Sequence, residues 1–293
     1  MTSSFAFRPR RSCLYMPGAN PRALEKAKGL PADMLVLDLE DAVAPEQKAE
    51  ARETVAAVVK ERAYGTREVL VRINSLDSEW GQEDLLATVA AGPDGILVPK
   101  IRKAADILAL EDALTIAGAS GELGLWSMIE MPEAILNIAD IAATAGTTRL
   151  RGFVVGANDL AKELGALATP DRRAFQVHLA LTLAAARAHG LIAIDAVFND
   201  FRDESGLRAE CEQGRIMGFD GKSLIHPAQL EAANELFSPD SDAVAKARAI
   251  IEAFALPENE NRGVIKVDGA MVELLHLEQA RRLVAISEAI DAS

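Results

Sequence analysis

The chain has 293 residues, of which 49% are hydrophobic and 26% charged, and its formal net charge is −13 at pH 7. This composition is typical of a globular protein, and the net negative charge opposes nonspecific binding to nucleic acid or to anionic membranes. No apolar run approaches the ~20 residues that span a bilayer, and the N-terminus has no apolar segment of signal-peptide length, so we expect a cytoplasmic protein.

Eight short apolar runs alternate with helical patterns along the chain. The runs are SCLYMP (12–17), MLVLDLE (34–40), EVLVRIN (68–74), GILVPK (95–100), LWSMIE (125–130), GFVVGAND (152–159), IAIDAVF (192–198) and GFDGKSLIH (218–226). Each is apolar nearly throughout, which is typical of parallel strands buried on both faces. The alternation predicts an α/β fold, a (β/α)₈ TIM barrel in residues 1–238. A doubly wound open sheet is the alternative, because one sequence does not show that the sheet closes.

The helical segments between these runs have recognisable ends. Pro45 suits the first turn of a helix, and residues 46–62 continue with a helical period. After the sixth run we expect a helix from about Pro170 to Ala188, followed by a His-Gly stop. A further helix is expected near residues 227–237.

Residues 239–293 predict a C-terminal helix–hairpin–helix arm. Residues 241–256 have the pattern of an amphipathic helix, and residues 263–290 begin as a hairpin and end as a helix. Asp268 and Gly269 stand between two apolar runs, and Gly tolerates the positive φ that a two-residue turn requires. We expect the arm to pack on a neighbouring subunit, with packing on its own barrel as the alternative.

Polar side chains collect at the ends of the predicted strands. In a TIM barrel the chemistry takes place at the carboxyl ends of the strands, where the loops meet. The residues in these positions are Asn20, Glu40, Asp41, Arg72, Asn74, Lys100, Glu130, Asn158 and Asp159. We therefore expect the functional site on this rim.

Glu130 and Asp159 end the fifth and sixth strands. Adjacent strands lie ~4.8 Å apart, so both carboxylates can reach one ion. Two carboxylates without His or Cys are hard oxygen ligands, which favours Mg²⁺ or Mn²⁺ over Zn²⁺. Such an ion would activate a substrate carbonyl. The structural alternative is that Asp159 caps the helix LAKELG and Glu130 neutralises a neighbour.

Arg72, at the end of the third strand, is a candidate substrate-binding residue. A guanidinium offers a planar, bidentate grip on a carboxylate. The alternative is an internal ion pair with Glu40 or Asp41, and both roles are compatible.

A second group of candidates could bind phosphate. Arg22 and Lys26 lie one turn apart on the first helix and could receive phosphates, or they could be solvated surface charges. His226, next to Pro227, could line a ligand, although a single His beside a helix start is typical of a structural residue.

Eight motifs stand in the order and spacing of one known family. They are RSCLYMPGANPRALEKA, LVLDLEDAVAPEQKAEAR, VRIN, ILVPKI, MIEMPEAI, GANDLAKELG, AIDAVF and GFDGKSLIHPAQ. In these motifs the chain resembles the citrate lyase beta-subunit/HpcH–HpaI aldolase superfamily, in its CoA-ester branch with malyl-CoA lyase. The resemblance covers nearly the whole sequence.

The resemblance implies a role for each matching residue. Glu130 and Asp159 would hold Mg²⁺, with Mn²⁺ possible, and Arg72 would hold the substrate near its carbonyl or carboxylate end. Glu40 and Asp41 would orient Arg72 and frame the metal site, and Asp38 would be a structural member of its strand. The CoA phosphates and adenine would lie near Arg22, Lys26, Ile225, His226 and Pro227.

The resemblance also implies an activity. The family reaction is carbon–carbon cleavage or formation in a 3-hydroxyacyl-CoA of the malyl, methylmalyl, citramalyl or citryl type, through an enolate, with an acyl-CoA and an oxo acid as partners. We expect such a Mg²⁺-dependent lyase, acting on a small-molecule CoA ester, as a homo-oligomer, a trimer or hexamer.

Glu273 departs from the family pattern. The family has an acid/base Asp in the arm, which enters the next subunit's site, whereas this chain has Glu273 in AMVELLH. An error of around 1 Å can cost two orders of magnitude in rate. Glu273, together with the motif FRDESGLRAECEQGR (201–215), resembles the (3S)-malyl-CoA thioesterase branch more than the malyl-CoA lyases, so thioester hydrolysis at the same site is an alternative. A non-catalytic CoA-binding subunit and an aldolase acting on free 2-oxo acids are the others.

Overall fold

The computed structural model describes residues 8–292. The described chain divides into two units, Arg10–Phe237 and a second unit of residues 8–9 with 238–292, and each is described here by itself. None of the helices in the described part has the length and apolar character that a bilayer-spanning segment needs.

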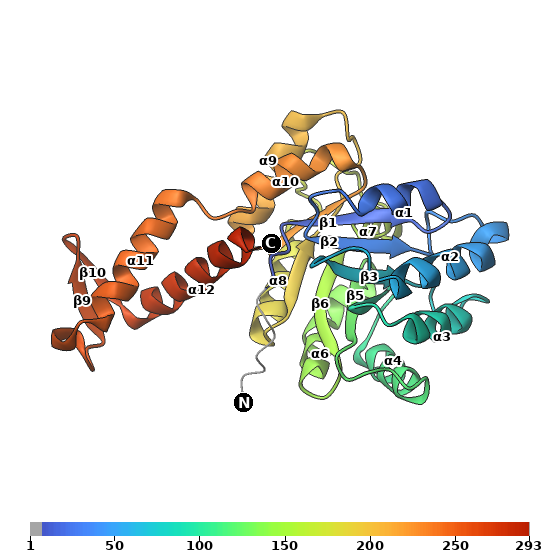
Figure 1. Cartoon of the computed structure of the whole chain (residues 1–293), viewed down its shortest axis with the longest axis horizontal. Helices are drawn as coiled ribbons and strands as arrows, with labels where there is room; N and C mark the ends of the chain where they lie inside the picture. Colours follow the sequence, from blue (N-terminus) through green and yellow to red (C-terminus); the bar gives the residue numbers. More distant parts are fainter. Residues whose placement is uncertain (1–7, 293) are drawn as a thin grey trace. The chain divides into compact units, whose positions relative to one another are not determined.

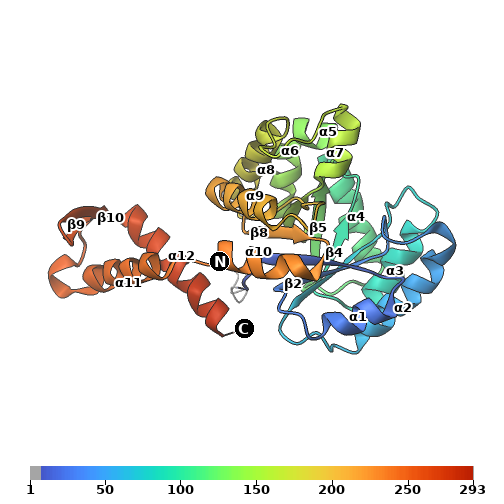
Figure 2. The same ribbon diagram turned by 90° about the horizontal axis from the view of Figure 1, so that it is seen from above.

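Eight parallel strands form a closed barrel in the order of the sequence (Figures 1 and 2). The last strand pairs with the first, so the predicted TIM barrel is confirmed and the open-sheet alternative is excluded. The strands are β1 (Ser12–Pro17), β2 (Met34–Asp38), β3 (Glu68–Arg72), β4 (Gly95–Val98), β5 (Gly124–Ile129), β6 (Leu150–Val155), β7 (Ile192–Asp195) and β8 (Gly221–Leu224).

Helices follow the strands around the barrel (Figure 1). The α-helices of this unit are α1 (Pro21–Ala27), α2 (Lys48–Lys60), α3 (Gly81–Ala91), α4 (Ala104–Ile116), α5 (Pro132–Leu136), α6 (Ile138–Ala143), α7 (Ala157–Leu164), α8 (Gln176–Ala188), α9 (Glu204–Met217) and α10 (Leu230–Leu236). Short 3₁₀ turns η1 (Pro45–Gln47), η2 (Thr144–Gly146) and η3 (Pro227–Gln229) complete the set. Pro45 therefore begins a single 3₁₀ turn that leads into α2.

The helix expected from Pro170 begins only at Gln176, so that prediction was wrong at its start. Arg172, within the segment, has φ +50, which a right-handed helix does not accommodate. Its guanidinium lies 2.7 Å from a carboxylate oxygen of Asp195. A tertiary ion pair thus holds this stretch in a loop.

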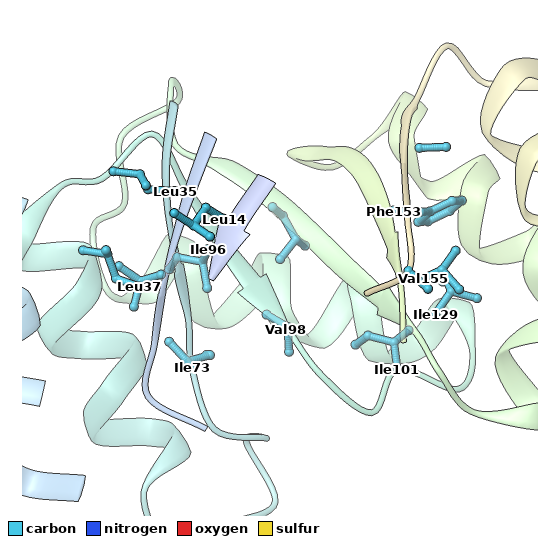
Figure 3. Packing of buried hydrophobic residues seen from close by; sticks show 14 of the residues in the cluster. Leu14, Leu35, Leu37, Ile73, Ile96, Val98, Ile101, Ile129, Phe153 and Val155 are labelled. Atoms are coloured by element: carbon cyan, nitrogen blue, oxygen red, sulfur yellow. The ribbon is translucent and has the colours of Figure 1, made fainter. Parts of the chain in front are cut away.

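The strands are buried on both faces, as their apolar sequences predicted. In β2, Leu35 and Leu37 belong to a cluster shared with the helices, whereas Met34 and Val36 belong to a second cluster made of strand residues. Figure 3 shows part of the larger cluster, in which Leu35 and Leu37 of β2 and Ile96 of β4 are labelled. The barrel interior is therefore a packed core.

A network of buried charges joins β7 and β8 to α9. Lys222 is fully buried, and its ammonium lies 3.2 Å from Asp195 and 2.6 Å from Glu210. Arg172 contacts both oxygens of Asp195, at 2.7 and 2.8 Å. Buried charges of opposite sign compensate one another's desolvation, so this network fixes the end of β7.

The second unit contains α11 (Ser241–Ala255), the 3₁₀ turn η4 (Pro257–Asn259), β9 (Val264–Val267), β10 (Ala270–Glu273) and α12 (Leu274–Asp291). Strands β9 and β10 form an antiparallel hairpin, and Asp268 and Gly269 both have positive φ at its turn. Helices α11 and α12 lie side by side and bury Ala247 against Ala280 and Val284 (Figures 1 and 2). The unit has the predicted helix–hairpin–helix order.

Candidate active site

The polar residues of the predicted rim follow the carboxyl ends of parallel strands and therefore share one end of the barrel. Asp38 and Arg72 are the last residues of β2 and β3 and are register partners. Lys100 follows β4, Glu130 follows β5, and Asp159 lies in the first turn of α7, just after β6.

Arg72 is held by three acids, chiefly by Asp38. Its Nε and Nη2 atoms donate to Asp38 at 2.7 and 2.6 Å, and Nη1 lies 2.8 Å from Glu40 and 3.2 Å from Asp41. Its guanidinium also lies over the Tyr15 ring, 5.1 Å from the centroid. We expected Glu40 and Asp41 to orient Arg72, but the bidentate contact belongs to Asp38.

Asp38 also organises the loop that follows β2. Its Oδ1 accepts a hydrogen bond from the Glu40 N–H at 2.9 Å, and its Oδ2 accepts one from the Ala42 N–H at 3.1 Å. Side-chain acceptors of this kind fix a turn in place of regular secondary structure. Asp38 is a structural member of β2, as expected, and its carboxylate also fixes the turn of the acidic segment.

Lys48 braces the same loop from α2. Its ammonium donates to the carbonyl oxygens of Leu39 and Glu40 at 2.8 and 2.7 Å, and to Asn74 Oδ1 at 2.8 Å. A lysine in a helix with a sequence such as KAEARE is typically solvated, so sequence pattern alone gave no signal for this buried contact. These hydrogen bonds from Lys48 fix the backbone at Leu39 and Glu40.

The Glu40 carboxyl has a raised pKa. Burial raises its pKa to about 8, although Arg72 opposes the shift. Its Oε2 lies at ion-pair distance from Arg72, but the two atoms are not aligned for a hydrogen bond. A carboxyl with this pKa can exchange protons near neutral pH, which makes Glu40 a candidate acid or base.

The raised pKa of Glu40 predicts a pH-dependent stability. An unfolded chain ionises Glu40 near the ordinary value of 4.5, whereas the folded chain retains the proton until about pH 8. The free energy of unfolding should therefore fall as pH rises through this window, by about 1–3 kcal/mol from this group. Glu40→Gln should remove that component, measured by urea unfolding from pH 5 to pH 9. Parallel pH profiles for Glu40→Gln and wild type would contradict the assignment, and Glu46→Gln is the exposed control.

Glu130 and Asp159 converge on Lys100. The Lys100 ammonium lies 2.7 Å from Asp159 Oδ1 and 3.2 Å from Glu130 Oε1, and the Lys100 backbone N–H donates to the same Glu130 oxygen at 2.8 Å. Burial raises the pKa of Glu130, although Lys100 opposes the shift. Burial lowers the pKa of Lys100, but the contacts with the two acids outweigh it and raise that pKa above its usual range. The two predicted metal ligands thus share one cation-binding position.

The surroundings of Glu130 fit a small cation with oxygen ligands. Glu130 is fully buried, yet its Oε2 has no hydrogen-bond partner. At Gly156 a Cβ would come 2.6 Å from that Oε2, so glycine there leaves the room that the carboxylate occupies. In residues 8–292 no three His, Cys, Asp or Glu side chains form a metal cluster, so two carboxylates would leave further positions to water or substrate.

Asp159 does not serve as the cap of its helix. Helix α7 begins at Ala157 with Gly156 at the N-cap position, and Asp159 instead contacts Lys100 through its side chain. The proposed alternative for Glu130, neutralisation of a neighbour, matches the Lys100 contact. It does not exclude metal binding, because Lys100 contacts Oε1 of Glu130 whereas Oε2 has no hydrogen-bond partner.

Arg22 and Lys26 lie exposed on α1, and neither makes an ion pair with the residues that the structure describes. Asn20, at the N-cap, accepts a hydrogen bond from the Ala23 N–H at 3.1 Å and fixes the start of this helix. Among residues 8–292 no ion pair occupies either side chain, so both are available to an anion.

The loop after β7 is fastened to its neighbours at this end of the barrel. Asn199 and Asn158 exchange amide hydrogen bonds of 2.7 and 3.2 Å. Phe201 stacks on His226, with 4.4 Å between ring centroids. Ile225 is exposed beside them, and Pro227 starts η3. The sequence singled out His226 but gave no indication of its aromatic partner.

Glu273 is the last residue of β10 and directly precedes α12, in the C-terminal unit. Its side chain is exposed, and its backbone N–H donates to His276 Nδ1 at 2.9 Å. Met271, two residues earlier, is 73% exposed, and Leu274 follows as another exposed apolar residue. An exposed acid bordered by exposed apolar side chains is a surface suited to contact with another protein surface.

A closed (β/α)₈ barrel with a buried arginine, a carboxyl of raised pKa and two converging acids after the carboxyl ends of its strands has the architecture of a TIM-barrel enzyme. The chain belongs to the HpcH/HpaI aldolase/citrate lyase family, whose sequence profile matches residues 11–227. Membership confirms the superfamily that the sequence motifs indicated, and with it the expectation of an enzyme.

The chain is similar to several characterised proteins over nearly its whole length. It is 52% identical to a (3S)-malyl-CoA thioesterase of Cereibacter sphaeroides, over 97% of this chain and 96% of that one. It is 34% identical to an L-malyl-CoA/beta-methylmalyl-CoA lyase of the same species, again over 97% and 96%. A crystal structure of protein CitE from Mycobacterium tuberculosis in complex with magnesium, acetoacetate and coenzyme A matches with 27% identity and a TM-score of 0.76. It covers 97% of this chain and 100% of that one.

Proposed function

We propose that the protein is a Mg²⁺-dependent thioesterase that hydrolyses (3S)-malyl-CoA. The observation that carries the proposal is the higher identity to a thioesterase than to a lyase that occurs in the same species. The lyase reaction, which the sequence resemblance put first, is the second candidate because the family contains both activities. The cytoplasmic location stays a prediction.

Glu130 and Asp159 are the proposed ligands of Mg²⁺, or of Mn²⁺. The unpartnered Glu130 oxygen and the shared cation position support this choice, as does the magnesium in the related crystal structure. When bound, the divalent ion supplies a Lewis acid that polarises a substrate oxygen. The two carboxylates would hold the ion in place, because one follows β5 and the other follows β6 of the barrel.

Arg72 is the proposed anchor for the anionic end of the acyl group. Asp38 accepts hydrogen bonds from the Nε and Nη2 groups of Arg72 and so fixes the plane of the guanidinium. The remaining Nη1 group contacts Glu40 and Asp41. A fixed guanidinium stabilises negative charge that develops on a nearby oxygen. Glu40 is the barrel's own proton-exchanging group, because its pKa lies near neutrality.

Hydrolysis requires a water oxygen to attack the thioester carbonyl while the carbon–sulfur bond breaks. The water gives up a proton, the CoA sulfur takes one, and malate and free CoA result. Glu273 of a neighbouring subunit is the proposed acid/base, in the position where the resemblance places the family's Asp. The CoA phosphates and adenine would contact Arg22, Lys26, Ile225, His226 and Pro227.

Product analysis tests the function directly. Purified protein with (3S)-malyl-CoA and Mg²⁺ should release free thiol and malate in equal amounts. Glyoxylate with acetyl-CoA would identify the lyase, and turnover of free 2-oxo acids without CoA would identify an aldolase. If several 3-hydroxyacyl-CoAs bind but none gives a product, the protein is a non-catalytic CoA-binding subunit.

A shared active site predicts complementation between subunits. Glu273→Ala and Arg72→Ala proteins should each be nearly inactive, and mixed oligomers should regain activity because some sites combine an intact arm with an intact barrel. The measurement is thiol release after subunit exchange, followed by mass determination of mixed trimers or hexamers. Confirmed mixing without recovered activity would contradict an arm that serves its neighbour.

A further inference from the structure

Lys100 is placed at the candidate metal site by an unusual backbone. Its φ is +59, which is uncommon for a residue with a Cβ, and its backbone N–H donates to Glu130 Oε1 at 2.8 Å. The side chain then brings its ammonium to 2.7 Å from Asp159 and 3.2 Å from Glu130. Both the backbone and the side chain of Lys100 are thus committed to the two acids.

We propose that Lys100 is an exchangeable internal cation: its ammonium holds Glu130 and Asp159 together until a divalent cation takes its place. The inference rests on the proposed metal site and concerns how that site binds its ion. Metal entry is then an exchange of one cation for another.

Electrostatics favours the exchange. The Lys100 ammonium contacts both carboxylates, so a divalent ion held by them would lie within a few ångströms of it, and two cations at that distance repel each other strongly in a partly buried site. Without any cation, Glu130 would be a fully buried carboxylate next to a second acid, which is costly. Lys100 removes that cost in the metal-free protein.

The side chain of Lys100 is suited to movement. It is 27% exposed, so its ammonium has a route to solvent, and lysine has a flexible four-carbon stem. The backbone hydrogen bond to Glu130 does not depend on the position of the ammonium. The strained backbone can therefore keep Glu130 in place while the ammonium leaves.

Lysine labelling of the wild-type protein tests the exchange. With a trace amine-reactive reagent, Lys100 should be labelled slowly without divalent ions and at least about fivefold faster with saturating Mg²⁺, as determined by mass spectrometry of peptides. Lys162, on α7 and 78% exposed, is the internal control and should not change. An unchanged rate at Lys100 would overturn the proposal.

A charge-removing variant provides a second measurement. Lys100→Met should bind Mn²⁺ about tenfold more tightly than wild type, measured from free Mn²⁺ by electron paramagnetic resonance, because no internal cation competes. Lys162→Met should bind like wild type. Equal or weaker binding by a folded Lys100→Met protein would overturn the proposal.

The two ideas fail in different ways. If wild-type protein binds no Mn²⁺, the proposed metal site is wrong, and the proposed exchange with Lys100 is wrong as well. If Mn²⁺ binds with unit stoichiometry and depends on Glu130, but neither labelling nor the Lys100→Met affinity changes, the metal site stands and the exchange is wrong.

Discussion

Glu130→Gln and Asp159→Asn should each reduce Mg²⁺-dependent turnover by at least about 1000-fold, the largest effect that we expect from any single substitution. Each change removes the negative charge of a proposed metal ligand but keeps the shape of the side chain. The barrel should remain folded, because an amide oxygen can still accept from the Lys100 backbone N–H. Steady-state kinetics over a range of Mg²⁺ concentrations, with circular dichroism as the fold check, is the measurement.

Glu133→Gln is the matched control for these variants. Glu133 lies on α5, three residues after Glu130, and its side chain is 53% exposed with only a long contact to Arg102. Its removal should leave turnover and Mg²⁺ dependence unchanged. Wild-type activity in either ligand variant would remove that residue from the metal site.

Arg72→Lys should lower kcat/KM on the order of 10²–10³-fold, the second largest effect. Lysine keeps a charge but offers no planar pair of N–H groups, so the bidentate contact with Asp38 and the orientation toward substrate are both lost. Asp38→Asn should cost less, about tenfold, because Glu40 and Asp41 still contact Arg72.

Arg102→Lys separates this effect from a general loss of arginine. Arg102 lies after β4 and is 45% exposed, with a 3.7 Å contact to Glu133, so this change should have no effect on kinetics. A kcat/KM within twofold of wild type for Arg72→Lys would argue that Arg72 is only part of an internal ion pair.

The barrel was predictable because a strand that is buried on both faces has a sequence that is apolar at nearly every position. Leu35 and Val36 are both apolar since one faces the helices and the other the interior. The loop at 170–175 was not predictable, because it depends on an ion pair between Arg172 and Asp195, which lies on β7. Local periodicity contains no information about such a partner.

The site was predictable at the level of residue types and strand ends. Glu130, Asp159 and Arg72 could be chosen because each stands at the end of an apolar run. The partners of these residues could not, because Asp38 reaches Arg72 through strand register and Lys100 reaches two acids through a left-handed backbone. Neither feature has a sequence pattern of its own.

Diffraction from a crystal soaked with Mn²⁺ tests the central claim, that two acids that follow the adjacent strands β5 and β6 hold one divalent cation at the mouth of the barrel. The anomalous signal should give one strong peak within coordination distance of both Glu130 and Asp159, with the Lys100 ammonium withdrawn. A peak at another group of side chains, or an ordered Lys100 still bound to both acids at saturating Mn²⁺, would contradict the account.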